Sequence, residues 1–271
     1  MERQTQSTNE PVLLQERHGH KLVLTLNRPA AMNAMNADLS GALGDALEDA
    51  ACDPSVWVVI LTGAGDRAFC AGVDLKASAR GESTHASQEA FDKWHFGGFV
   101  KHVISKPIIA AVNGFALGGG TEIALASDLV VAADTATFGL PEVKRGLLAG
   151  AGGTFRLPQQ IPKKLAMEIL LTGEPLTAER ARDLGLVNRV VPREQLLESA
   201  LELADRICVN APLSVQATKR MALGIDGDQI ASDEEHWERS KKEFAELRKT
   251  ADYREGPRAF AEKRKPNWQG Q

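Results

Sequence analysis

The chain has 271 residues, 43% hydrophobic and 25% charged, which is the composition of an ordinary globular protein. Its formal net charge of -4 argues against nucleic-acid binding as a main role, because nucleic-acid-binding surfaces are strongly basic. The N-terminus is polar and no apolar run reaches the length of a membrane span, so we expect a cytoplasmic protein without membrane contact.

Four short apolar runs predict buried strands, at Leu22–Leu26, Val56–Thr62, Pro107–Val112 and Leu129–Ala133. Segments with helical periodicity, Ala37–Ala51 and Ser87–Ile104, lie between these runs. This alternation is typical of βαβ units and predicts an α/β core with a largely parallel sheet.

From Lys163 onward the pattern is mostly helical. Thr177 is a suitable N-cap for a helix over Ala178–Leu184. Further helices are expected at Glu194–Val209, Ala211–Leu223 and Asp233–Arg248. We therefore expect residues 1–195 to form the α/β core and residues 196–271 to form a helical C-terminal region.

The cysteines and histidines predict neither disulfides nor a metal site. Cys52, Cys70 and Cys208 are odd in number and lack CxxC spacing, and the six histidines are scattered. Cys70 has no base nearby in the sequence, so we expect a buried packing residue rather than a nucleophile.

A glycine motif follows the second expected strand. The run Gly63-Ala64-Gly65-Asp66-Arg67-Ala68 formally fits the dinucleotide fingerprint GxGxxA. A true fingerprint needs a helix that opens at these glycines, whereas the next residues, Phe69–Gly72, predict extended chain and a turn. We expect a strand-end loop and no NAD site.

The segment Ala71–Lys76 contains a candidate oxyanion donor. Gly72 would turn the backbone so that the Val73 N–H projects into a cleft. The alternative is a simple strand-to-helix turn capped by Asp74.

Glu122 follows three glycines, in the stretch Leu117-Gly118-Gly119-Gly120-Thr121-Glu122. If a helix begins near Gly119, Glu122 lies on the same face as the Gly119 N–H. This helix N-terminus would favour an oxygen that gains negative charge, as in an enolate or a tetrahedral intermediate. The alternative is that the glycines allow tight helix–strand packing and that Glu122 is a solvated first-turn acid.

Glu142 is a second candidate acid, after the elbow Phe138-Gly139-Leu140-Pro141. Near the C-terminus, Glu255–Lys265 combines an aromatic side chain with cations at helical spacing. This run predicts a solvated helix face or, alternatively, contact with a phosphate-bearing ligand through Phe260 and Lys263.

Five segments resemble, in order and spacing, the enoyl-CoA hydratase/isomerase (crotonase) superfamily: Asn27–Ala34, Phe69–Lys76, Ala110–Gly120, Pro141–Glu142 and Gly150–Thr154. The resemblance continues to the C-terminus. It is nearest to bacterial crotonobetainyl-CoA hydratases and actinobacterial enoyl-CoA hydratases.

The resemblance implies a crotonase (ClpP/crotonase-like) spiral of ββα units and a C-terminal helical region that forms a homotrimer, or a hexamer as a dimer of trimers. It implies an oxyanion hole from the backbone N–H groups of Val73 and Gly119. Glu122 and Glu142 would hold a water that Gly150 helps to position.

The same resemblance implies contacts with the acyl-CoA substrate along the residues Ala30, Met32, Ala34, Ala71, Val73, Asp74, Leu75, Lys76, Gly118, Gly119, Pro141, Phe260 and Lys263. Ala30 departs from the many members that carry Lys or Arg there. No cofactor or metal is expected, because the CoA thioester is itself the substrate.

The implied activity is syn addition of water to a 2-enoyl-CoA, which gives a 3-hydroxyacyl-CoA. Alternatives on the same fold are crotonobetainyl-CoA hydration and isomerisation of an enoyl-CoA by one glutamate. An alternative of another class is an acyl-CoA-binding or RNA-binding protein without catalysis.

Overall fold

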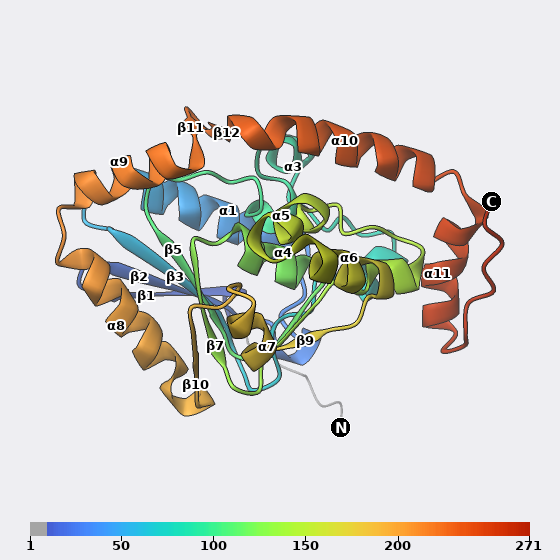
Figure 1. The fold of residues 1–271 in the computed structure, drawn as a ribbon, viewed down its shortest axis with the longest axis horizontal. Helices are drawn as coiled ribbons and strands as arrows, with labels where there is room; N and C mark the ends of the chain where they lie inside the picture. The colour runs from blue at the N-terminus through green and yellow to red at the C-terminus, as the bar shows by residue number, and fades with distance from the viewer. Residues whose placement is uncertain (1–9) are drawn as a thin grey trace, which may run out of the picture.

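The computed structural model describes residues 10–271, with a six-stranded sheet through the centre of the molecule (Figure 1). The strand order is β1-β2-β3-β5-β7-β10. Strand β1 pairs antiparallel with β2, and the remaining neighbours are parallel. The strands are β1 (Leu13–His18), β2 (Lys21–Leu26), β3 (Val58–Gly63), β5 (Ile108–Val112), β7 (Leu129–Ala133) and β10 (Arg189–Val191).

A second sheet has the order β4-β6-β8-β9, with β9 antiparallel to β8. Its strands are β4 (Ala68–Cys70), β6 (Phe115–Leu117), β8 (Thr137–Gly139) and β9 (Leu176–Thr177). Each long parallel strand β3, β5 and β7 thus leads into a short strand of the second sheet. This repeated strand–strand unit confirms the predicted crotonase spiral.

Helices surround the two sheets. In the first two thirds of the chain they are α1 (Ala37–Cys52), α2 (Leu75–Ala79), α3 (Gln88–Trp94), α4 (Gly119–Ala126), α5 (Gly153–Gln160), α6 (Lys163–Thr172) and α7 (Ala178–Asp183). Helices α8 (Leu196–Cys208), α9 (Pro212–Leu223), α10 (Ala231–Leu247) and α11 (Ala251–Ala261) follow. Short 3-10 turns are η1 (Pro29–Ala31), η2 (Phe96–Gly98), η3 (Pro141–Arg145) and η4 (Arg193–Gln195), and β11 (Ile225–Asp226) pairs with β12 (Gln229–Ile230).

Local sequence explains where several helices begin and what they bury. The Thr177 hydroxyl accepts the Arg180 N–H at 3.2 Å, which confirms the predicted cap of α7. Asn36 caps α1 in the same way, through the Leu39 N–H at 3.1 Å. Helix α1 then buries Leu39, Leu43 and Leu47, whose spacing of four places them on one face.

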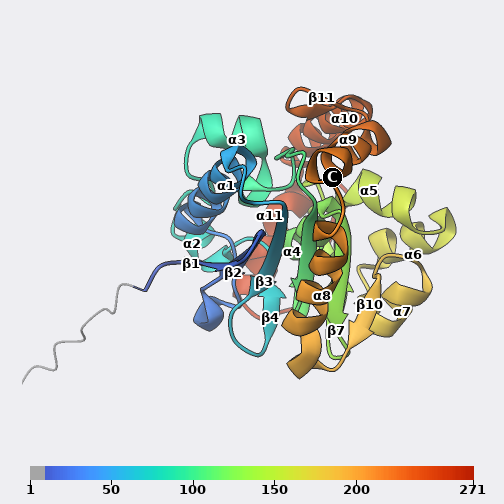
Figure 2. The ribbon, with the colours of Figure 1, turned by 90° about the vertical axis from the view of Figure 1, so that its left-hand side faces the viewer.

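Helix α8 packs on the central sheet against β3, β5 and β7 (Figure 2). It contributes Leu196, Ala200 and Ala204 to the hydrophobic core. Helix α9, by contrast, has no fully buried residue. Helix α8 therefore belongs to the hydrophobic core. The division of the chain into an α/β core and a C-terminal helical region at residue 195 stays a prediction.

The helix expected over Ser87–Ile104 is wrong beyond Trp94, where α3 ends. His95, Gly97 and Gly98 all have positive φ, so the chain leaves the right-handed helical region at once. A Cβ on Gly98 would lie 2.2 Å from the Ser40 carbonyl oxygen. This close approach to α1 requires the glycine and stops the helix.

Thr121 joins the two short strands that lead to the glutamates. Its buried hydroxyl lies 2.7 Å from the Ala116 carbonyl oxygen and 3.0 Å from that of Gly139, and it accepts the Gly139 N–H at 2.9 Å. The start of α4 is therefore tied to both β6 and β8.

We expect Thr121→Val to destabilise the protein by about 1–3 kcal/mol, because a buried N–H loses its acceptor. Urea unfolding followed by circular dichroism would measure this loss. The matched control is Thr135→Val, since Thr135 is exposed. Equal midpoints for the two variants would contradict this role for Thr121.

Candidate active site

The glycine turn places the start of α4 against a bulky aromatic ring. Helix α4 begins at Gly119, as the glycine motif predicts, and Gly118 precedes it with φ of +55°. A Cβ on Gly119 would lie 2.1 Å from the Phe96 ring. Only glycine therefore allows the ring and the helix terminus to approach this closely.

The two candidate oxyanion donors lie on adjacent segments. Gly72 has a φ of +85°, and a Cβ there would lie 3.2 Å from the Gly119 nitrogen. The expected turn is thus present directly beside the start of α4. Within residues 10–271, we find no backbone hydrogen bond from the N–H of Val73 or Gly119.

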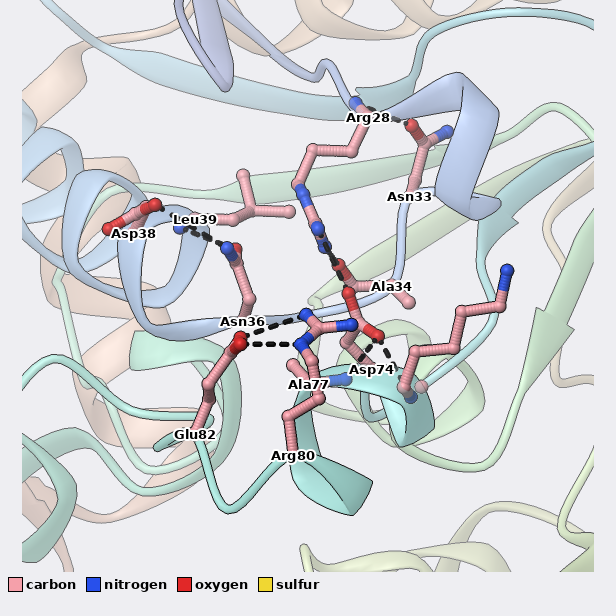
Figure 3. A network of polar contacts seen from close by, with 12 residues as sticks. Arg28, Asn33, Ala34, Asn36, Asp38, Leu39, Asp74, Ala77, Arg80 and Glu82 are labelled. Carbon is pink, nitrogen blue, oxygen red and sulfur yellow. Dashed lines mark hydrogen bonds and ion pairs between the residues drawn. The ribbon is translucent and has the colours of Figure 1, made fainter. Parts of the chain in front are cut away.

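A polar network holds Asp74, the residue that follows Val73 in the chain (Figure 3). The Arg28 guanidinium donates to Asp74 at 2.9 Å and also to the Ala34 carbonyl. Asp74 accepts the N–H groups of Lys76 and Ala77, which confirms that it caps α2. Burial opposes the charge on Asp74, but these donors hold its pKa below the usual range. Capping of the turn by Asp74 is therefore compatible with a candidate oxyanion donor at Val73, and the two do not exclude each other.

Glu122 is buried, with 3% of its surface exposed, so it is not a solvated first-turn acid. Its Oε1 accepts the Gly153 N–H at 2.9 Å, at the N-terminus of α5. The Ala151 N–H and the positive charge of Arg156 also act on this carboxyl. These groups favour its charged form.

Glu142 approaches from the turn η3, after the Leu140-Pro141 elbow. The residue as a whole is half-buried, but its Oε2 is buried and finds no hydrogen-bond partner among residues 10–271. A Cβ on Gly118 would lie 3.0 Å from Glu142 Oε1. This carboxyl therefore lies directly beside the glycine turn.

The two glutamates influence each other's ionisation. Burial raises the pKa of Glu122, and the nearby charge of Glu142 adds to this shift. Burial also raises the pKa of Glu142 to about 7. Because like charges repel, the pair loses its two protons in separate steps, and one proton is retained near neutral pH. Such a pair suits a reaction that needs both an acid and a base.

The remaining candidate substrate residues lie on several elements of the fold. Ala30, Leu75 and Lys76 are exposed, Met32, Ala71 and Pro141 are half-buried, and Ala34 is buried. Phe260, on α11, stacks on the guanidinium of Arg145, 4.0 Å from the ring centre. Lys263 is exposed just after α11. Their contact with CoA stays a prediction.

Gly150 makes two hydrogen bonds that the sequence did not indicate. Its N–H donates to the Leu148 carbonyl at 2.8 Å, and its own carbonyl accepts from Ser240 of α10 at 3.0 Å. Positioning of a water molecule by Gly150 stays a prediction. Ser240 and Arg156 were missed, because no local pattern marks a residue whose partner is distant in the chain.

Residues 17–271 match the protein-family profile for enoyl-CoA hydratase/isomerase. The chain belongs to the enoyl-CoA hydratase/isomerase family. It is 42% identical to a carnitinyl-CoA dehydratase of Proteus mirabilis over 257 residues, which cover 93% of this chain and 96% of that protein.

Solved structures agree with this family assignment. A carnitinyl-CoA hydratase from Mycobacterium avium superposes with a TM-score of 0.94 at 56% identity, over 97% of this chain and 100% of that chain. An enoyl-CoA hydratase from Mycobacterium tuberculosis has a TM-score of 0.74 at 45% identity, with the same coverage. The predicted crotonase family and fold are confirmed.

Two further observations concern residues 10–271 of this family member. None of its helices in that range has the length and apolar character needed to cross a membrane. The same range contains no group of three or more His, Cys, Asp or Glu side chains placed to hold a metal ion.

We expect Glu142→Gln to stabilise the folded protein at pH 9 more than at pH 5. The protonated Glu142 favours folding below its unfolded pKa of 4.5, and this contribution is lost as the pH rises through about 7. Glutamine does not titrate, so the variant gains up to about 3 kcal/mol over wild type across this window.

Thermal unfolding of both proteins at the two pH values would measure this difference. Glu168→Gln is the control, because Glu168 is exposed on α6. A gain of equal size at pH 5 and pH 9 would contradict a raised pKa for Glu142.

Proposed function

We propose that this protein is a hydro-lyase that adds water to a 2-enoyl-CoA and so forms a 3-hydroxyacyl-CoA. The observation that carries the proposal is the buried pair Glu122 and Glu142 beside the N–H groups of Val73 and Gly119. The relatives named as hydratases and dehydratases of CoA thioesters support it. The CoA thioester is the substrate, and the proposed chemistry needs no cofactor.

The oxyanion donors make the substrate electrophilic. The thioester carbonyl oxygen would accept the N–H groups of Val73 and Gly119. As water attacks the β-carbon, negative charge moves onto this oxygen, where the two donors and the N-terminus of α4 stabilise it. These interactions strengthen in the transition state, so they lower the barrier rather than only bind substrate.

The two carboxyls then divide the proton transfers. We assign the base to Glu122, because its Oε1 accepts the Gly153 N–H at 2.9 Å, and the Ala151 N–H and the positive charge of Arg156 also favour its charged form. Its complete burial works against the charge and raises its pKa, and these groups offset part of that effect. Glu142 has a buried oxygen without a partner, so it is the group that holds the proton.

Two proton transfers accompany the addition of water. Glu122 takes one proton from water, the water oxygen bonds to the β-carbon, and Glu142 delivers its proton to the α-carbon. Both groups would approach the double bond from the same face, so the addition would be syn. Return of a proton from Glu122 to Glu142, directly or through solvent, restores the starting state.

The relatives also suggest a substrate class. Several of them are named carnitinyl-CoA dehydratases, with 42% identity over most of the chain. We therefore include crotonobetainyl-CoA, with crotonyl-CoA and a medium-chain enoyl-CoA, among the substrates to be tested.

We expect rapid loss of the conjugated-thioester absorbance when the protein is mixed with at least one of these three thioesters. Glu122→Gln and Glu142→Gln should each lower kcat by about 10²–10⁴-fold, because each removes one proton transfer. Glu168→Gln is the control for replacement of a carboxylate by an amide. Binding of a CoA thioester, measured by calorimetry, should survive in both active-site variants.

A Glu142→Gln variant with near wild-type turnover would contradict the paired-acid mechanism. Binding without hydration of any of the three thioesters would instead favour the isomerase alternative. Incubation with a 3-enoyl-CoA and analysis of its products would test that alternative directly.

We also propose that the chain assembles as a trimer or as a dimer of trimers. Large apolar side chains are strongly exposed on and beside α9: Val209 (84%), Leu213 (75%) and Met221 (84%). Burial of these side chains against a second copy would remove their apolar surface from water.

Light scattering after size-exclusion chromatography should give three or six times the chain mass of 29.2 kDa. Leu213→Glu should shift the distribution toward smaller species, because a charge would be buried at the interface. Leu75→Glu is the control at another exposed leucine, which is 45% exposed. A wild-type protein of 29.2 kDa at micromolar concentration would exclude a stable trimer.

A further inference from the structure

Helix α10 presents one face to the loop that carries Gly150 and the start of α5. Asp233, Trp237, Ser240 and Phe244 recur at intervals of four, three and four residues, which places them on a single helix face. In Figure 1, α10 crosses above α5. Residues 77 and 90 positions apart in sequence are thus brought together next to the segment that contacts Glu122.

Ser240 holds a peptide group in the loop directly before Gly153, whose N–H donates to Glu122 Oε1 at 2.9 Å. The Ser240 Oγ donates to the Gly150 carbonyl at 3.0 Å. The N–H of the same peptide belongs to Ala151 and acts on the Glu122 carboxyl. The C=O and N–H of a trans peptide point in opposite directions within one rigid plane. Fixing the carbonyl therefore also fixes the direction of the N–H.

Gly150 makes this hydrogen bond important, because glycine restricts the backbone less than other residues do. The neighbouring side chains approach it closely. A Cβ on Gly150 would lie 3.2 Å from Phe244 and 3.3 Å from the Ser240 hydroxyl. The peptide is therefore held from the α10 side by one hydrogen bond and by close packing.

A buried ion pair keeps α10 in register with α5. Arg156 donates to Asp233 at 3.1 Å and to the Val100 carbonyl at 2.7 Å, and both charged residues are buried. The guanidinium lies 5.2 Å from the ring centre of Trp237. Because a buried charge needs its partner, this pair opposes sliding of α10 along α5.

We propose that Ser240 is a positioning residue for Glu122, and that it acts through the peptide group between Gly150 and Ala151. Ser240 touches neither substrate nor water in this proposal. The proposal rests on the proposed function only where activity is measured, since the ionisation of Glu122 can be observed without turnover.

The charged groups that act on Glu122 are Glu142 on η3 and Arg156 on α5, which is paired with Asp233 on α10. Ser240→Ala leaves all of them in place. The variant loses only the hydroxyl that orients the Gly150 carbonyl. A change in the ionisation of Glu122 then reports on the Ala151 N–H.

We expect Ser240→Ala to lower kcat about tenfold with little change in KM. The acid limb of the kcat pH profile should move to higher pH by about half to one pH unit. The pKa of Glu122 should rise because its charged form loses an aligned hydrogen-bond donor. Ser232→Ala on the same helix is the control, since Ser232 is exposed. Ser240→Thr keeps the hydroxyl and should keep the wild-type acid limb.

Infrared titration of the protonated carboxyl band, assigned by its loss in Glu122→Gln, should show the same rise in the Glu122 pKa. A Ser240→Ala variant with an unmoved carboxyl titration would overturn the proposal, even with lower activity or lower thermal stability. Absence of hydration by wild type would instead reject the proposed function, and the infrared titration would still decide the role of Ser240.

Discussion

Two carboxyl groups buried side by side are the constraint on which the rest of the site depends. Each would ionise readily in water, and burial raises the pKa of both Glu122 and Glu142. Mutual repulsion favours retention of one proton by the pair, which supplies an acid and a base at the same pH. The N–H groups of the surrounding backbone then determine which carboxyl carries the charge.

The ββα spiral delivers the groups that surround this pair. Strand β6 leads into the glycine turn and α4, and β8 leads into the turn that carries Glu142. The parallel pairing of β6 and β8, together with Thr121, holds the two turns next to each other. Strand β4 is the other neighbour of β6, and it leads to the turn that brings Val73 to the same place. Three successive turns of the spiral therefore meet at one site.

The C-terminal helices connect this site with the outer part of the molecule. Helix α10 contacts the loop around Gly150 and pairs with Arg156, whereas α11 packs on the turn that carries Glu142. Helices from the last quarter of the chain thus pack against the loop that contacts Glu122 and the turn that carries Glu142. Any assembly that restrains these helices would also restrain that loop and that turn.

Much of this architecture followed from the sequence by itself. Apolar runs located the parallel strands, Asp74 and Thr177 marked helix starts, and the glycine motif placed the start of α4 at Gly119. The family motifs predicted the spiral, and the comparisons confirmed it. These signals are local, because strand burial, capping and backbone turns depend on neighbouring residues.

Tertiary structure decided the rest. Helical periodicity predicted a continuous helix over Ser87–Ile104, but close packing of Gly98 on α1 ends it at Trp94. The burial of Glu122 and the raised pKa of both acids exist only once the spiral has closed around them. Ser240 and Arg156 lie 90 and 77 residues from their partners Gly150 and Asp233. Hydrogen bonds between residues far apart in sequence, and the burial of a carboxyl group, arise only in the folded chain, so no local sequence pattern predicts them.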